Sequence, residues 1–311
     1  MNVGKYIYLI FLISFFAACT NEPEEDIDSE EGIFNFYFDR IPDLGSCYEG
    51  ILKDTRKQEA LSYVNYVRSL HNLSPVSYDN TSDLQTQKAA FMSVANQTIT
   101  HTPSVNSKCY SPEGADGCLA SNLSFAGHSG FYPDHTDEYV IEGFMKEKNS
   151  PSIGHRRWIL FPFLKCISYG RAFGKPEGSE FYLSASALKV IYSETQDVNV
   201  SSIPFIAYPH NNYPSKLFET DCFLSFSVVF DKSKMWTNVG FAFANIEVRN
   251  ESNQSMPVSE KSYDIDGSGM PNSIQWKVAH LVKGVLYTVS IKNVDVEGIK
   301  KDFQYNFKLI D

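Results

Sequence analysis

Apolar side chains recur at helical spacing in three segments of the first half of the chain. These segments are residues 54–71, 82–97 and 137–148, and in the first of them the charged side chains fall largely outside the apolar face. Ser82 or Asp83 is suited to cap the start of the second segment, because short polar side chains accept hydrogen bonds from the first turn of a helix. The pattern therefore predicts three amphipathic helices.

Strand-like patterns follow these helices. Residues 167–172 and 181–192 form two such runs, and the second alternates apolar and polar positions. Helices followed by strands are typical of a layered α+β domain, which we expect over residues 47–194. After Val198 the chain changes to short β-rich runs separated by turn residues, which predict a small all-β sandwich domain over residues 198–311. The runs are 223–230, 237–248, 274–278, 284–294 and 305–310.

The N-terminus has a different pattern. Lys5 precedes an almost unbroken apolar run from Tyr6 to Ala18, which is shorter than the roughly 20 residues that span a bilayer as a helix. We therefore expect a cleaved signal peptide over residues 1–18. Residues 16–19 read Phe-Ala-Ala-Cys and resemble the bacterial lipobox, which implies a lipid on Cys19. The alternative is a plain signal peptide followed by an incidental cysteine.

Acidic residues dominate the segment that follows Cys19. Between Asn21 and Glu31 the like charges cannot bury apolar area, so residues 19–46 are expected to form a flexible, solvated linker. Acyl chains on Cys19 bind a membrane almost permanently, since each buried methylene contributes roughly 0.8 kcal/mol. The predicted location is therefore the outer membrane or the cell surface, with the protein anchored by lipid.

Composition limits the partners and the number of domains. The 311 residues carry a formal net charge of -10, which disfavours nucleic acid as a partner. With 43% hydrophobic residues, the exported part can bury either one large core or two modest cores. The patterns described above favour two.

Five cysteines remain beyond Cys19, in a compartment where disulfides can form. An odd number predicts that one of them is free. Cys109 and Cys118 flank a turn-rich stretch, and closing that short loop is the pairing we expect. A bond between Cys47 and Cys166 is a second conjecture.

Three motifs occur in order in the first predicted domain. Residues 64–76 join an opening helix, which carries an Asn and an Arg, to a Leu-Ser-Pro-Val turn. Residues 100–103 read Thr-His-Thr-Pro after an Ala-rich helix, and residues 154–160 read Gly-His-Arg-Arg-Trp-Ile-Leu. Taken in this order and spacing, they resemble the CAP superfamily, the SCP-like extracellular domain. The resemblance covers residues 47–194.

This resemblance implies a three-layer α-β-α sandwich with a shallow central cavity. In the family, two histidines from separate segments meet in that cavity, often beside acidic residues, and can hold a divalent metal such as zinc. Matched by motif, the two histidines are His101 and His155. Two imidazoles with one or two carboxylates suit zinc and leave a coordination position open.

The sequence departs from the family pattern at the acidic positions. Where many members have Gly-Glu-Asn-Leu, this chain has Ala-Ser-Asn-Leu, so Ser121 replaces the first cavity carboxylate beside Asn122. For the second carboxylate we rank Glu142 ahead of Glu138 and Glu147, although a solvated helix charge is the ordinary interpretation for all three. The weakened acidic set implies modest metal affinity.

Three further motifs resemble functional sites but also have an ordinary structural interpretation. Residues 127–131 approach the Gly-x-Ser-x-Gly elbow of hydrolases, but Phe131 replaces the second glycine, which favours a loop. Residues 264–269 begin like a calcium loop but lack the downstream bidentate Glu, which favours a tight strand connection. Aromatic residues in the segment 208–214 offer a glycan-binding face, although turn and core packing is the ordinary interpretation.

Three hypotheses for function follow. The first is a surface module, with little or no catalysis, that binds an extracellular lipid, glycan or protein and requires no cofactor. The second is a zinc-assisted hydrolase that uses His101 and His155, with Glu142 or a water completing the shell. The third is a glycan or cell-wall adhesin acting through the C-terminal domain. The hydroxyl at Ser121 favours the first hypothesis over the second.

Overall fold

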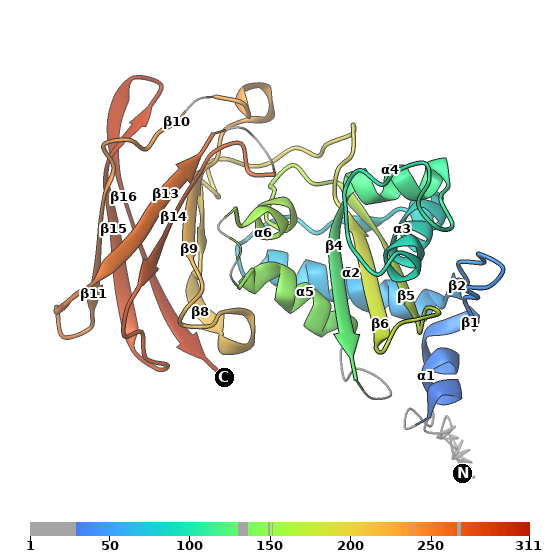
Figure 1. The fold of residues 1–311 in the computed structure, drawn as a ribbon. Helices are drawn as coiled ribbons and strands as arrows, with labels where there is room; N and C mark the ends of the chain where they lie inside the picture. Colours follow the sequence, from blue (N-terminus) through green and yellow to red (C-terminus); the bar gives the residue numbers. More distant parts are fainter. Residues whose placement is uncertain (1–28, 130–135, 149, 151, 238, 266–268) are drawn as a thin grey trace, which may run out of the picture.

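The computed structural model describes residues 29–129, 136–148, 150, 152–237, 239–265 and 269–311 (Figure 1). The predicted signal peptide and Cys19 lie outside the described residues. Within the described part, no helix combines the length and the apolar composition that crossing a membrane requires.

A four-stranded sheet forms the centre of the first region. Its strand order is β3-β5-β6-β4. The strands are β3 (Ser77–Tyr78), β5 (Cys166–Gly174), β6 (Tyr182–Lys189) and β4 (Ser121–His128). The ranges of β5 and β6 agree with the two strand-like runs of the sequence, whereas β4 was not expected.

Helices cover both faces of this sheet (Figure 1). One face carries α3 (Asp83–Ala95) and α4 (Pro112–Ala120), and the other carries α2 (Asp54–Ser69) and α5 (Asp137–Lys146). The short helix α6 (Gly154–Ile159) follows α5, and a single 3-10 turn (Asn80–Ser82) precedes α3. The three amphipathic helices and the α+β class are therefore confirmed.

Close approach of α3 to the sheet requires a glycine. A Cβ atom placed on Gly170 in β5 would lie 2.3 Å from the backbone carbon of Thr86 in α3. The side chain of Gln87 also bonds to the backbone of Arg171, accepting from its N–H at 3.2 Å and donating to its carbonyl at 2.7 Å. The helix therefore packs on the strand backbone itself.

An additional helix lies inside the range expected to be a flexible linker. Helix α1 (Glu30–Tyr37) leads into β1 (Phe38–Arg40), which pairs with β2 (Ile51–Leu52). The last two glutamates of the acidic run, Glu30 and Glu31, occupy the first helical turn, where negative charge is favourable. The aromatic residues that follow them pack on Phe173 of the sheet. Residues 30–40 therefore differ from the expected linker.

The expected pairing of Cys109 with Cys118 is wrong. Cys109 bonds to Cys47, with a Cα–Cα distance of 5.3 Å, and the thiols of Cys118, Cys166 and Cys222 are free. The turn-rich stretch between Cys109 and Cys118 folds as α4, capped by Ser111. The segment is therefore a helix rather than a tight turn that brings its two ends together, and Cys118 is a buried thiol within α4.

The second region is all β and consists of two facing sheets, as the sequence predicts. One sheet has the order β12-β11-β15-β16-β8, with β10 paired to β15, and the other has the order β13-β14-β9-β7. Strand β8 pairs in parallel with the C-terminal strand β16. The first sheet contains β8 (Asn211–Pro214), β10 (Val239–Gly240), β11 (Asn245–Asn250), β12 (Ser255–Met256), β15 (Leu286–Val296) and β16 (Ile299–Ile310). The second contains β7 (Phe205–Tyr208), β9 (Leu224–Val228), β13 (Val258–Asp264) and β14 (Ser273–Val278), and two 3-10 turns occupy Ser215–Leu217 and Lys232–Lys234.

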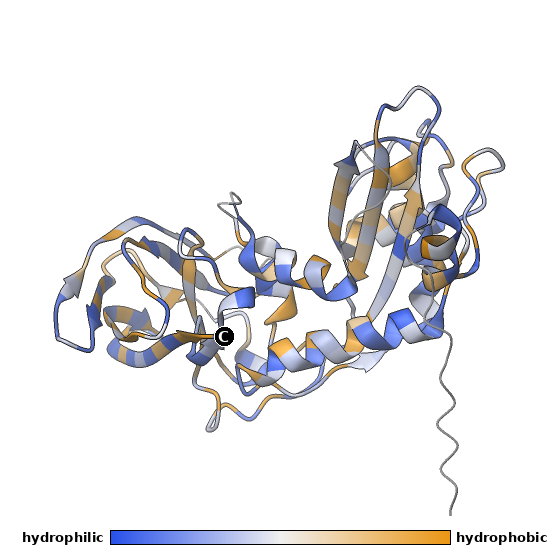
Figure 2. Ribbon diagram, turned by 90° about the horizontal axis from the view of Figure 1, so that it is seen from below, coloured by the Kyte–Doolittle hydropathy of each residue, from blue (hydrophilic) through white to orange (hydrophobic). Residues whose placement is uncertain are grey.

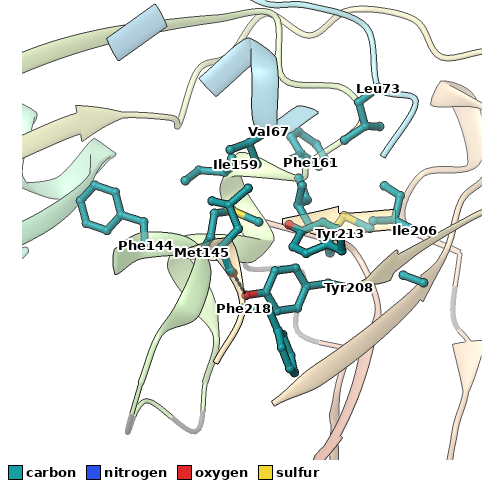
Figure 3. Close-up of a cluster of buried hydrophobic side chains, with 14 of the residues drawn as sticks. Val67, Leu73, Phe144, Met145, Ile159, Phe161, Ile206, Tyr208, Tyr213 and Phe218 are labelled. Atoms are coloured by element: carbon teal, nitrogen blue, oxygen red, sulfur yellow. Dashed lines mark hydrogen bonds between the residues drawn. The ribbon is translucent and has the colours of Figure 1, made fainter. Parts of the chain in front are cut away.

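One hydrophobic cluster joins the two regions, which lie side by side in Figure 2. Apolar side chains from α2, α5 and α6 meet those of β7, β8 and the turn after β8 (Figure 3). The labelled members are Val67, Leu73, Phe144, Met145, Ile159, Phe161, Ile206, Tyr208, Tyr213 and Phe218. The β-rich region is therefore fixed directly against the helices of the first region.

Candidate ligand-binding cleft

A cleft of about 410 Å³ lies between the sheet and helix α5 in the first region. Strands β4 and β6 supply its floor, and α5 and the start of α6 supply its walls. The lining residues are Leu123, Ser124, Phe125, Ala126, Tyr139, Val140, Gly143, Phe144, Glu147, Lys148, Ser150, His155, Ser184, Ala185 and Ser186. This size is typical of sites for small ligands.

Serine hydroxyls form part of the floor. Ser124 of β4 is directly opposite Ser186 of β6, and Ser184 lies two residues away on the same face of β6. Ser184 and Ser186 are buried, and Ser124 is partly buried. The floor therefore offers both hydrogen-bond donors and acceptors.

A buried ion pair supports this floor. Arg171 of β5 is opposite Ser186 and donates to Asp137 Oδ1 at 2.6 Å, with both side chains 1% exposed. Tyr169 donates its hydroxyl hydrogen to the same oxygen at 2.8 Å and lies 3.2 Å from the Ser186 hydroxyl. Burial raises the pKa of Tyr169 well above its usual value, so it remains a donor. The hydrogen bond to Tyr169 therefore fixes the position of the Ser186 hydroxyl.

Glu147 and His155 form the opposite end of the cleft. The buried carboxylate of Glu147 accepts from the backbone N–H groups of His155 and Arg156, both at 3.1 Å, so it caps α6. His155 Nδ1 lies 3.3 Å from Glu147 Oε1, and the imidazole packs against Phe144 with ring centroids 4.9 Å apart. One third of the His155 side chain (33%) stays exposed toward the cleft. Glu147 therefore orients this ring.

Asn122 acts on the same element from the sheet. Its side chain is buried and donates to the backbone carbonyl of His155 at 3.0 Å. Its neighbour Ser121 is also buried, but its hydroxyl has no hydrogen-bond partner in the described structure and does not line the cleft. The structure therefore gives Asn122 a positioning contact and gives Ser121 none.

Of the five expected cavity residues only His155 lines the cleft, and the contacts of His101 and Glu142 lie elsewhere. His101 is exposed, its Nδ1 is 2.8 Å from the backbone carbonyl of Cys118, and it does not line the cleft. Glu142 accepts from the Tyr63 hydroxyl at 2.7 Å and lies 3.7 Å from Lys146, so it faces α2. The sequence could not separate Glu142 from Glu147, because both positions suit helix charges.

The donor set does not fit a metal ion. Both oxygens of Glu147 bond to backbone N–H groups, His101 is absent from the lining, and Ser121 replaces a carboxylate. In the described ranges, no group of three His, Cys, Asp or Glu residues is arranged to hold a metal. Zinc sites normally have at least three such protein ligands.

The arginines of the Gly-His-Arg-Arg motif face the β-rich region. Arg156 donates to the backbone carbonyl of Phe223 at 2.7 Å and stacks on Tyr208, 3.9 Å from the ring centroid. Arg157 pairs with Asp264 and donates to the carbonyl of Met270 at 2.9 Å. The motif thus presents its histidine to the cleft and its arginines to the second region.

These features define an α+β domain of the CAP type that is followed by a β-rich region. The sequence model of the Cysteine-rich secretory protein family, CAP, matches residues 61–185, so this part of the chain is a CAP domain. Such domains are typical of secreted proteins, and the disulfide between Cys47 and Cys109 agrees with that location. No curated protein matches the sequence.

Proposed function

We propose that this protein is an exported surface protein that binds a neutral, hydrogen-bonding extracellular ligand in the CAP-domain cleft without a metal. The observation that carries the proposal is the composition of the cleft. It combines a serine floor with the oriented His155 and the aromatic side chain of Tyr139, which is 47% exposed. Aromatic faces and hydroxyls together suit saccharides and amides.

The preferred polarity of the ligand follows from the free energy of removing the serine hydroxyls of the floor from water. An acyl chain lying on Ser124 and Ser184 would remove their hydroxyls from water without replacing the lost hydrogen bonds. Each unsatisfied group costs about 1–3 kcal/mol. A ligand with hydroxyl or amide groups avoids this cost, so the proposal favours a glycan over a lipid tail.

The anchor belongs to the same proposal. Lipid on Cys19 would place the CAP domain outside the membrane, joined to it by residues 20–29. Mass spectrometry of the membrane-extracted protein tests this part, with Cys19→Ser as the control that should release the protein.

Titration of two probes tests the binding function. The soluble form that lacks residues 1–19 is titrated with an N-acetylglucosamine tetramer and, separately, with phosphatidylcholine vesicles, both in the presence of a chelator. The proposal predicts saturable binding of the saccharide, with His155→Ala weakening it. Binding of the vesicles alone, or saccharide binding that requires added zinc, would contradict the proposal.

A further inference from the structure

A second cavity of about 310 Å³ lies in the first region, and it shares no lining residue with the cleft. The segment that includes β2 forms one wall, and α2 and the start of α3 form the other. In Figure 1, β1 and β2 lie at the right edge of the molecule, near α3. Nothing in the proposed function uses this cavity.

Its outer wall is preformed. The segment starts directly after the disulfide at Cys47, and Tyr48 is paired with Asp43 through two backbone hydrogen bonds. Gln87 of α3 donates to the backbone carbonyl of Glu49 at 2.8 Å. The Glu49 side chain therefore projects from a wall that is fixed on both sides, which reduces the entropic cost of binding.

The one ammonium group in the lining has its charge already neutralised. Lys57 donates to Asp83 at 2.8 Å and to Asp54 at 2.9 Å. Asp83 also accepts from the Tyr78 hydroxyl at 2.9 Å and from the Ser168 hydroxyl at 3.1 Å. An anionic ligand would have to displace Asp83 from this network, which would leave a carboxylate without its counter-charge.

The carboxylate of Glu49 does not belong to this network of ion pairs and hydrogen bonds. It lines the cavity, is partly buried, and has no hydrogen-bond or ion-pair partner among the residues that the structure describes. Two carboxylates and one ammonium line the cavity, so one negative charge is uncompensated. The rest of the chain adds to the attraction for cations, since the net charge is -10.

Apolar groups complete the cavity. Ile51 and Leu84 both line it and are 41% and 46% exposed, and Tyr48 and Leu52 extend the apolar surface. Exposed aliphatic side chains beside an unpaired carboxylate suit a ligand that carries a positive charge on a short hydrocarbon chain.

We propose that this cavity binds a small organic cation, an alkyl ammonium, whose charge pairs with Glu49 and whose hydrocarbon chain lies against Ile51 and Leu84. A free amine and the side chain of a lysine in a peptide share this chemistry. The volume of the cavity accommodates either of them, but it is at the lower end for ligand sites.

Three probes with the same hydrocarbon chain and different head-group charges test which charge the cavity prefers. Hexylammonium, hexanol and hexanoate are each titrated into the soluble form lacking residues 1–19 at neutral pH, and binding is followed by chemical-shift changes of Leu84 and Ile51. The expected order of affinity is hexylammonium, then hexanol, then hexanoate. Nα-acetyl-lysine methylamide, tested in parallel, decides between a free amine and a peptide side chain as the source.

Two variants and a matched control locate the site. Glu49→Gln should weaken hexylammonium about fivefold and leave hexanol unchanged, because it removes only the charge pair. Leu84→Asn should weaken both probes. Glu177→Gln removes an exposed carboxylate on a turn elsewhere and should change neither. Equal or tighter binding of hexanoate, or unchanged hexylammonium binding in Glu49→Gln, would overturn the proposal.

Discussion

At the scale of single residues, Glu147 supports the binding end of the cleft. Its carboxylate both caps α6 and faces the imidazole of His155, and only 2% of its side chain is exposed. Its backbone is left-handed, with a φ of 43°, at the end of α5. One residue therefore ends one helix, starts the next and orients the cleft histidine.

Removal of this carboxylate should lower stability. We expect Glu147→Ala to reduce the free energy of unfolding by about 1–3 kcal/mol, because two buried backbone N–H groups lose their acceptor. Urea denaturation measures the effect. Glu138→Ala, on the exposed face of α5, should change stability by less than about 0.5 kcal/mol. Equal losses in the two variants would show that Glu147 has no special role.

The separation of His101 from the cleft leads to a prediction about zinc. His155 lines the cleft and His101 does not, so the two should not act as one metal site. Calorimetric titration of the soluble form with zinc should reveal no micromolar binding that His101→Ala and His155→Ala both abolish. Such binding, lost in each variant, would restore the metal-site hypothesis.

At the scale of helices and strands, glycine positions decide how closely the layers approach. Gly170 faces the backbone of α3, whereas a Cβ on Gly143 of α5 would meet nothing within 4 Å. The same substitution should therefore have opposite effects at the two positions.

The pair Gly170→Ala and Gly143→Ala tests this packing. Gly170→Ala should lower the free energy of unfolding by about 1–3 kcal/mol through overpacking against α3. Gly143→Ala should raise it by up to about 1 kcal/mol, because alanine favours a helix interior. Thermal and urea unfolding measure both variants. Destabilisation by Gly143→Ala would mean that this side of α5 is not open.

Periodicity predicted the long helices and missed the short elements. Helices α2, α3 and α5 each carry apolar residues at helical spacing, which one sequence reveals. Helix α6 has six residues, too few for two turns, and α4 is rich in glycine and acidic residues. The prediction of a Cys109–Cys118 bond was wrong for this reason, because the segment that was interpreted as a turn is α4.

The candidate site was predicted in part. The motifs identified His155, which lines the cleft, and Asn122, whose side chain donates to the backbone carbonyl of His155. The support of Ser186 by Tyr169, Asp137 and Arg171 depends on contacts between segments up to 34 residues apart. Those contacts exist only after the sheet and α5 have packed, so spacing along the chain cannot indicate them.

At the scale of the whole molecule, polar groups are buried where the two regions meet. His71 lies at this junction, 3.2 Å from the Tyr213 hydroxyl, and stacks on Tyr208. Burial, with a smaller contribution from nearby His210, lowers the pKa of His71 to about 3. The histidine is therefore neutral in the folded protein across the physiological range.

Stability should fall as the solution is acidified. An unfolded histidine has a pKa of about 6.5, so between pH 6.5 and pH 3 the unfolded state binds the additional proton and folding becomes less favourable. Protonation of His71 in the unfolded state should lower the free energy of unfolding by about 2 kcal/mol between pH 7 and pH 5. Urea unfolding at both values should show this loss, and His71→Gln should reduce it. An unchanged pH dependence in His71→Gln would contradict the assignment.

The most direct test of the ligand-binding cleft is to fill it without disturbing the fold. Gly143→Leu adds a side chain at the lining of the cleft where the backbone leaves open space. We predict that the N-acetylglucosamine tetramer, titrated by calorimetry with a chelator present, binds this variant at least about tenfold more weakly than the parent. Thermal stability should be equal or higher, and Glu138→Leu on the outer face of α5 should bind as the parent does. Unchanged affinity in a folded Gly143→Leu protein would contradict the account.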